Sequence, residues 1–153
     1  MPPLAAPRHQ AFAMDWQYPP QQREDYQFMG LLNAYRCSGG LARADEVQAL
    51  CARRGGPSLP VLARWMVQRD VIGFEWQTDY WLPLFQFQHD MTPLPQLAPV
   101  CAELHAVYDA RELAAWFVQP NAWLGNAVPA DCLLTDPAAV LDAARAARFT
   151  SQG

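Results

Sequence analysis

Residues 58–87 read SLPVLARWMVQRDVIGFEWQTDYWLPLFQF, and the spacing of the apolar side chains changes near the middle of this stretch. In its first half the apolar residues recur at intervals of three or four: Leu59, Leu62, Trp65 and Met66. This spacing predicts a helix, for which Ser58 is a natural N-cap. Beyond Asp70 the chain is rich in β-branched and aromatic residues, which predicts strands over residues 71–77 and 80–87.

The two predicted strands form a hairpin, because Thr78-Asp79 between them suits a tight turn. Pro83 either confines the second strand to a sheet edge or ends it. Upstream, the spacing predicts another helix over residues 43–54, which the Gly-Gly-Pro sequence at 55–57 breaks. Helix, turn, helix and hairpin, in this order, are typical of a small winged helix-turn-helix module.

A further helix is predicted over residues 24–36. The stripe expected to face the core is Tyr26, Met29, Leu32 and Tyr35. Prolines crowd the first twenty residues, which show little periodicity, so residues 1–22 are predicted to be a flexible, Pro-rich tail. Trp16 lies in this tail and is a candidate docking residue.

Residues 89–153 predict a helical domain that begins with a polar, Pro-containing segment. Its first apolar stripe is Leu97, Val100, Cys101, Leu104 and Val107. Asp109 and Glu112 have the spacing of a capping box at the start of the next helix. The expected fold is therefore mainly α. A degenerate winged helix-turn-helix with one β-hairpin, over residues 23–88, packs on a C-terminal helical bundle.

The composition suits a binding protein with two different surfaces. Apolar residues make up 52% of the 153 residues, which is enough for a core. Residues 36–69 carry six arginines and two acids, whereas residues 90–153 carry three arginines and seven acids. A basic middle and an acidic end predict different partners.

The sequence carries no sign of secretion or of membrane insertion. No window approaches the run of about 18 apolar residues that spans a bilayer, and the N-terminus lacks a basic-then-apolar layout. The four cysteines are far apart, so we expect small buried residues in a reducing compartment: Cys37, Cys51, Cys101 and Cys132. These features predict a cytoplasmic protein with no membrane partner.

No pattern in the sequence predicts catalysis. Serine is scarce, no serine lies in a G-x-S-x-G elbow, and no glycine loop suits a phosphate. His89-Asp90, His105 and Asp109 match part of a metal phosphohydrolase set, but His9 is poorly placed to supply the missing upstream histidine. We expect a non-enzymatic protein without a cofactor or a metal.

Residues 113–147 read LAAWFVQPNAWLGNAVPADCLLTDPAAVLDAARAA and contain a second group of turn signals. The proline before Asn121 ends a helix, and Asn121 suits the cap of the next turn. Gly125-Asn126 tolerate positive φ angles, and Pro129 suits the start of a new helix. Core packing is the simplest explanation for these apolar residues: Trp65, Trp116, Trp123, Leu124 and Leu141.

These motifs resemble the toxin-binding domain of the MbcA/ParS/Xre antitoxins. The family pattern is W-L at a helix end, P-N-x-x-L-G-G, P-x-D-L-L, and a last helix with V-L. The matching positions are Trp116-Phe117, Pro120-Asn121, Leu124-Gly125-Asn126, Pro129, Asp131, Leu133 and Val140-Leu141. A P-x-F-Q-F segment common in such proteins matches Pro83-Leu84-Phe85-Gln86-Phe87, so the resemblance covers roughly residues 40–148. Asn126 stands where the family prefers glycine, and asparagine is the next most tolerant residue there.

The resemblance implies an antitoxin that neutralises a RES-domain toxin, an enzyme that consumes NAD, by blocking its active site with the C-terminal region. The partner-binding residues we predict are Asn121, Trp123, Asn126, Arg145, Arg148 and Phe149. Residues 149–153 are expected to form a short free end that suits a partner's cleft. The sequence leaves open whether the protein forms a homo-oligomer.

Relatives of this kind often bind their own promoter, so operator DNA is a second expected partner. The candidate DNA-binding residues are Arg53, Arg54, Arg64, Gln68 and Arg69. However, the connection over residues 52–57 is longer than the three or four residues of a good helix-turn-helix, and Pro60 falls near the start of the recognition helix. An equally open alternative is therefore that this segment is only a structural remnant of a helix-turn-helix with a solvated basic face. A second alternative for the whole protein is a stand-alone transcription regulator or adaptor whose C-terminal module binds a different protein.

Overall fold

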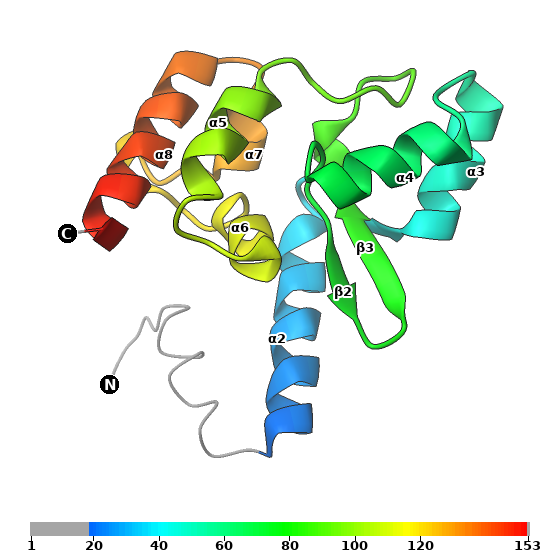
Figure 1. Ribbon diagram of the computed structural model, residues 1–153. Coiled ribbons are helices and arrows are strands. Elements are labelled where there is room, and N and C mark those ends of the chain that lie inside the picture. The colour runs from blue at the N-terminus through cyan, green and yellow to red at the C-terminus, as the bar shows by residue number, and fades with distance from the viewer. Residues whose placement is uncertain (1–18, 153) are drawn as a thin grey trace.

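The computed structural model describes residues 19–152, and its elements follow the predicted order (Figure 1). The first six are α2 (Pro20–Tyr35), β1 (Leu41–Arg43), α3 (Ala44–Arg54), α4 (Leu59–Gln68), β2 (Phe74–Trp76) and β3 (Asp79–Pro83). A 3-10 turn η2 (Leu84–Gln86) is followed by α5 (Leu97–Leu104), α6 (Ala110–Trp116), the 3-10 turn η3 (Ala122–Leu124), α7 (Pro129–Cys132) and α8 (Pro137–Gln152). The mainly α fold with a small antiparallel sheet is confirmed.

The sheet has one strand more than the sequence predicts. β1 pairs with β3, so the strand order is β1-β3-β2 and β3 is the central strand. Pro83 is the last residue of β3 and lies opposite Leu41, so it ends the strand, and its assignment to a sheet edge is wrong. Gln77 has a φ of 55° at the turn between β2 and β3. The predicted strands are too long, because residues 84–86 form η2.

Helix α2 begins at Pro20, so residues 20–22 are helical and do not belong to a tail. The rest of the predicted tail, including Trp16, lies outside the described residues. The buried residues of α2 are Phe28, Leu31 and Tyr35. Of the predicted core stripe, Tyr26 and Met29 are instead more than half exposed. The Phe28 ring stacks on Trp76 at 3.9 Å between centroids, and the Tyr35 hydroxyl donates to the Ala114 carbonyl at 2.7 Å. These two contacts fix which face of α2 is buried.

The connection between α3 and α4 has the length of a helix-turn-helix turn. α3 continues to Arg54, so only residues 55–58 join the two helices, and the expectation of an overlong turn is wrong. Gly55 ends α3 with a φ of 67°, and the Gly56 N–H donates to the Cys51 carbonyl at 2.8 Å. Glycine adopts this left-handed conformation at little cost, which explains why the chain turns there.

The buried residues form two clusters, and they do not follow a division of the sequence at residue 88. The smaller cluster lies among α3, α4 and the sheet: Ala42, Val47, Cys51, Leu62, Val71, Leu82 and Met91. The larger cluster combines residues of α5, α6 and α8 with Phe28, Leu31 and Tyr35 of α2 and with Ile72 and Phe74 near β2. The module and the C-terminal helices therefore share the larger core.

Helix α8 is longer than expected. It runs from Pro137 to Gln152, so residues 149–152 are helical and do not form a free end. Asp136 is its N-cap residue, since its carboxylate accepts from the Ala139 N–H at 3.2 Å. Helix ends are the part of a helix that sequence patterns define least well, and the sequence-based boundary placed this end too early.

Candidate partner-binding surfaces

The turn over residues 121–127 is closed by hydrogen bonds to Asn121. The Asn121 side chain accepts from the Trp123 N–H at 2.9 Å, and its backbone carbonyl accepts from the N–H groups of Leu124 and Asn126, both at 2.9 Å. The Asn121 N–H donates to the Ala127 carbonyl at 3.0 Å. Gly125 and Asn126 have φ angles of 63° and 69°, as the sequence predicts. The turn is thus an ordered element that packs against α8.

Trp123 points out of this turn. Its side chain is 66% exposed, so the expectation that it packs in the core is wrong, while Leu124 beside it packs against the larger cluster. Leu134 is a further exposed apolar residue, at 61%, which the sequence reasoning missed. The signal was the Leu133-Leu134 pair that follows α7 (Pro129–Cys132), since the side chains of neighbouring residues point in different directions; Leu133 is the buried member.

Helix α8 carries the other three predicted partner-binding residues. Arg148 donates to the Glu103 carboxylate on α5 at 3.1 Å, and Arg145 lies 3.8 Å from the same carboxylate. Both arginines therefore tie α8 to α5. Phe149 is 79% exposed one turn beyond Arg145. The structure thus arranges the six predicted residues as two groups, one on the 121–127 turn and one on the last turns of α8.

The acids of the C-terminal region have local roles. Glu103 and Asp142 pair with arginines of α8, and Asp131 accepts from the Ser38 hydroxyl at 2.9 Å. Asp109 and Glu112 form the predicted capping box, with bonds of 2.8 and 2.9 Å. The predicted acidic surface is therefore built largely from side chains that cap helices or join elements. They still contribute negative charge to this half of the molecule.

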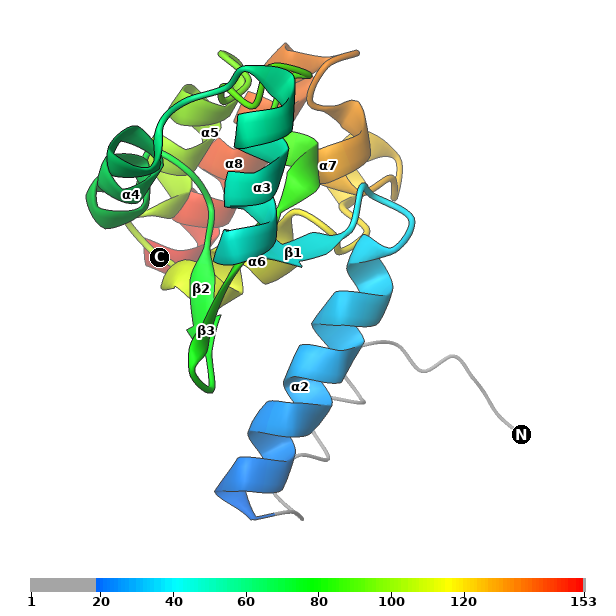
Figure 2. The same cartoon turned by 90° about the vertical axis from the view of Figure 1, so that its right-hand side faces the viewer.

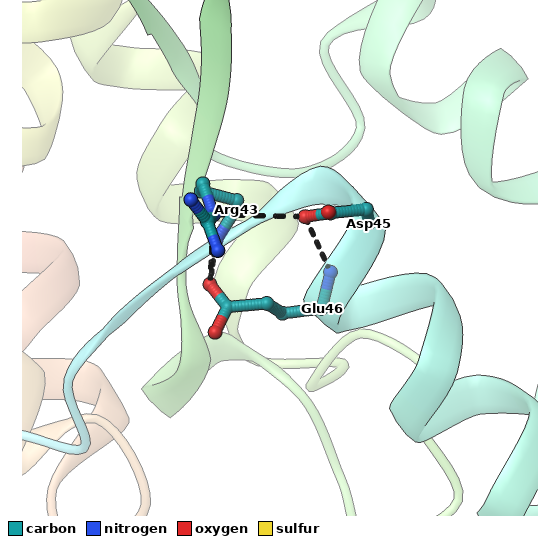
Figure 3. Close-up of polar contacts among 3 residues, drawn as sticks. All are labelled: Arg43, Asp45 and Glu46. Carbon is teal, nitrogen blue, oxygen red and sulfur yellow. Dashed lines mark hydrogen bonds and ion pairs between the residues drawn. The ribbon is translucent and has the colours of Figure 1, made fainter.

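In the module, the two acids of residues 36–69 both lie beside one arginine. Figure 3 shows Arg43 close to the carboxylates of Asp45 and Glu46, at 3.7 and 3.5 Å. The predicted DNA-binding residues Arg53, Arg54, Arg64, Gln68 and Arg69 are all exposed. Within residues 19–152, the arginines of that set form no ion pair, so residues 36–69 keep an excess of positive charge.

The same residues come from three places in the module. Arg53 and Arg54 end α3, Arg64 lies in the middle of α4, and Arg69 lines a small cavity next to His105. Val67 and Leu59 of α4 are 82% and 52% exposed. A helix that reads base edges needs polar side chains on its outer face. The outer face of α4 is largely apolar, a property that the predicted core stripe of this helix did not indicate.

The small cavity, of about 340 Å³, brings His105 and Arg69 together. Both ring nitrogens of His105 are buried, and neither has a hydrogen-bond partner among those residues. Burial, and then the positive charge of Arg69, lower the pKa of His105. A neutral imidazole without a neighbouring nucleophile does not define an active site.

The other groups considered for chemistry are placed as structural residues. Asp90 accepts from the backbone N–H and the hydroxyl of Thr92, and these bonds lower its pKa. Across residues 19–152, no three His, Cys, Asp or Glu side chains lie close enough to hold a metal ion together. Cys101 is buried, which raises its pKa to about 12, whereas Cys37 is exposed, contrary to expectation.

Comparisons of the chain with models of protein families, with curated proteins and with solved structures found no match. Among residues 19–152, no helix is both long enough and apolar enough to cross a bilayer.

Proposed function

We propose that this protein is an antitoxin-like protein that binds and neutralises a RES-type, NAD-consuming toxin in the cytoplasm. The exposure of Trp123 on an ordered turn is the observation that supports this proposal most. Its indole is 66% exposed, yet hydrogen bonds fix the turn that carries it. A large aromatic side chain on an ordered turn loses little conformational entropy on binding, and such side chains dominate the affinity of many interfaces. The resemblance of residues 113–147 to the MbcA/ParS/Xre toxin-binding domain supports the choice of partner.

The experiment is co-expression with a RES-domain protein encoded by a neighbouring gene, followed by pull-down and an assay of NAD consumption. We expect the intact protein to suppress consumption of NAD. Trp123→Ala and Phe149→Ala should each raise the Kd at least about tenfold. Val67→Ala is the matched control, because Val67 is equally apolar and 82% exposed, but lies on α4. It should leave binding unchanged.

The outcomes separate the two functions that the sequence leaves open. A double variant at Trp123 and Phe149 that still inhibits the toxin as tightly as the intact protein contradicts the proposed surface. If no RES-domain protein is bound or inhibited, the antitoxin function is wrong, and a role as an adaptor or regulator with a different partner is favoured.

Binding to operator DNA is a second candidate, supported by the arginines of α3 and α4 that have no acidic partner. Because they come from several places in the module, we expect a mainly electrostatic contact whose affinity falls steeply with salt. Arg53→Glu with Arg64→Glu should abolish it. Arg23→Glu with Arg36→Glu, the same change of charge on α2 and at its C-cap, should reduce it much less. Sequence-specific binding that survives the first pair of substitutions would place the DNA contact elsewhere.

A further inference from the structure

A groove of about 1260 Å³ lies between α2 and α6. One wall comes from α2, including Met29, Gly30 and Leu32. The other comes from Tyr108 and α6, where Arg111 and Glu112 line the groove beside Ala115. Figure 1 shows the hairpin along one side of α2 and α6 beside its C-terminal part. Figure 2 shows the N-terminal half of α2 projecting beyond the rest of the fold. The groove therefore opens along a helix that is covered on one side only.

The wall on α2 is apolar and open. Met29 is 57% exposed, and Leu32, one turn further along, is partly buried. A Cβ atom added at Gly30 would meet nothing within 4 Å. The opposite face of the helix carries Phe28, Leu31 and Tyr35, which are buried in the larger cluster. Apolar residues thus lie on both faces of α2, and on the groove side Met29 is the one that the described residues leave largely exposed.

The chain itself contains a segment that matches this wall. Residues 12–18 read FAMDWQY, in which large apolar side chains occupy every second position: Phe12, Met14, Trp16 and Tyr18. In an extended chain, residues two apart point to the same side. The segment therefore has one apolar face and one face made of Ala13, Asp15 and Gln17.

The length of residues 12–18 and their point of attachment to α2 also fit the groove. The segment ends two residues before Pro20, the first residue of α2. An extended chain rises about 3.3 Å per residue and a helix about 1.5 Å per residue. Met14 thus lies about 13 Å along the strand from Tyr18, and Met29 about 13.5 Å along the helix from Pro20. If the chain reverses at Pro19, Met14 comes level with Met29. A tether this short gives an effective concentration in the millimolar range.

We propose that residues 12–18 of the same chain occupy this groove as an extended segment antiparallel to α2, with the Met14 side chain against Met29. The groove is then a site for an extended peptide with large apolar residues at alternating positions, filled by the protein's own N-terminal region. This surface is separate from the 121–127 turn and from the end of α8.

The first test uses the full chain with Cys37→Ser and Cys132→Ser, which removes the thiols that are not fully buried. Met14→Cys combined with Met29→Cys should form a disulfide within one molecule under mild oxidation. The matched control is Met14→Cys combined with Val67→Cys, because Val67 is 82% exposed on α4. We expect cross-linking at least about tenfold faster at position 29, with a monomer on a non-reducing gel. Equal rates at the two positions overturn the proposal. Cross-linked dimers alone overturn it too, since they mean that a second copy fills the groove.

The second test measures binding in trans. A chain lacking residues 1–18 keeps every residue of both buried clusters, and circular dichroism checks that it is folded. A labelled peptide of residues 8–18 should bind this chain at least about tenfold more tightly than it binds the full chain. Met29→Glu in the shortened chain should abolish binding, whereas Val67→Glu should not. A peptide of the same composition with its large apolar residues placed together should bind weakly. Equal binding of the two peptides contradicts the alternating face.

Discussion

Gln86 is fully buried, and its side chain takes the place of a strand partner. Its amide nitrogen donates to the carbonyls of Ile72 and Pro83 at 2.8 and 2.9 Å, and its amide oxygen accepts from the Ile72 N–H at 2.6 Å. The two bonds to Ile72 hold η2 against the segment that enters β2, and the bond to Pro83 closes the turn of η2 itself. This explains physically why a glutamine suits the fourth position of the P-x-F-Q-F segment.

Gln86→Leu should therefore destabilise the fold by about 2–4 kcal/mol, because it leaves the buried N–H and C=O of Ile72 without partners. Urea unfolding followed by circular dichroism measures this change. Gln48→Leu is the control, since Gln48 is exposed on α3, and it should change the free energy of unfolding by less than about 0.5 kcal/mol. Equal effects of the two substitutions would mean that the hydrogen bonds of Gln86 make no net contribution to the free energy of unfolding.

His105 gives the stability a dependence on pH. Because burial lowers its pKa in the folded state, the unfolded chain binds a proton more readily. This contribution to stability is fully present above the unfolded pKa of 6.5 and is lost as the pH falls from there towards the folded value. Between about pH 7.5 and about pH 5, the intact protein should lose more stability than His105→Gln does. Urea midpoints at the two pH values measure this. His89→Gln, at an exposed position, should behave like the intact protein; identical losses in all three proteins contradict the role of His105.

At the scale of the element, the stability of the 121–127 turn depends more on its backbone conformation than on side-chain packing. Asn126 is exposed and has a φ of 69°, which β-branched residues adopt only with strain. Asn126→Val should lower the free energy of unfolding by about 1–2 kcal/mol, while Asn126→Gly should leave it unchanged or raise it slightly. Urea unfolding gives both values. Ala127→Val is the control, because Ala127 is also exposed but does not have a positive φ. An Asn126→Val protein as stable as Ala127→Val would contradict the importance of this conformation.

The turn was predictable from the sequence because its signals are local. Proline, asparagine and glycine restrict φ and ψ at their own positions, so Asn121 and Gly125 could be assigned before the structure was known. The same holds for the capping box of Asp109 and Glu112. The conformation of each of these residues is set by neighbours within a few positions in the sequence.

The buried face of α2 was not predictable in this way. Both Tyr26-Met29-Leu32 and Phe28-Leu31-Tyr35 have helical spacing, and only distant contacts decide between them. The partner of Phe28 is Trp76, and the partner of Tyr35 is Ala114. β1 was missed for a related reason: three residues carry little pattern, and their pairing with β3 is a long-range contact.

At the scale of the candidate sites, the sequence shows which residue types could contact a partner. It does not show whether their side chains are already engaged within the fold. Arg145 and Arg148 were proposed as partner contacts, and both already bind Glu103. The exposure of Trp123 could not be derived, because Trp123 and Leu124 are both apolar and only one fits the core. Which of two neighbouring apolar residues is exposed depends on how η3 packs on α8.

At the scale of the whole molecule, α2 and the C-terminal helices share one core, so a truncation cannot remove the partner surface without disturbing the rest of the fold. α2 is the first described helix, yet it packs against residues of the last third of the chain. Removal of the C-terminal helices would take away part of the core that buries α2 and leave the Tyr35 hydroxyl without its acceptor, the carbonyl of Ala114. A truncation would then unfold the helix-turn-helix-like module as well as remove the partner surface.

We therefore expect a chain that ends at Tyr108 to lack cooperative unfolding. It loses α6, α7 and α8, and with them nine of the nineteen described buried residues of the larger cluster. The apolar burial lost is as large as the ~5–15 kcal/mol by which a domain of this size is stable. Urea unfolding and near-UV circular dichroism test this. The control lacks residues 1–18 and should unfold in a single cooperative transition close to that of the intact chain. A sigmoidal transition and a native near-UV spectrum for the chain ending at Tyr108 would show that residues 19–108 fold alone. In that case the module and the C-terminal helices are independent units, and truncation becomes a valid way to locate the toxin-binding surface.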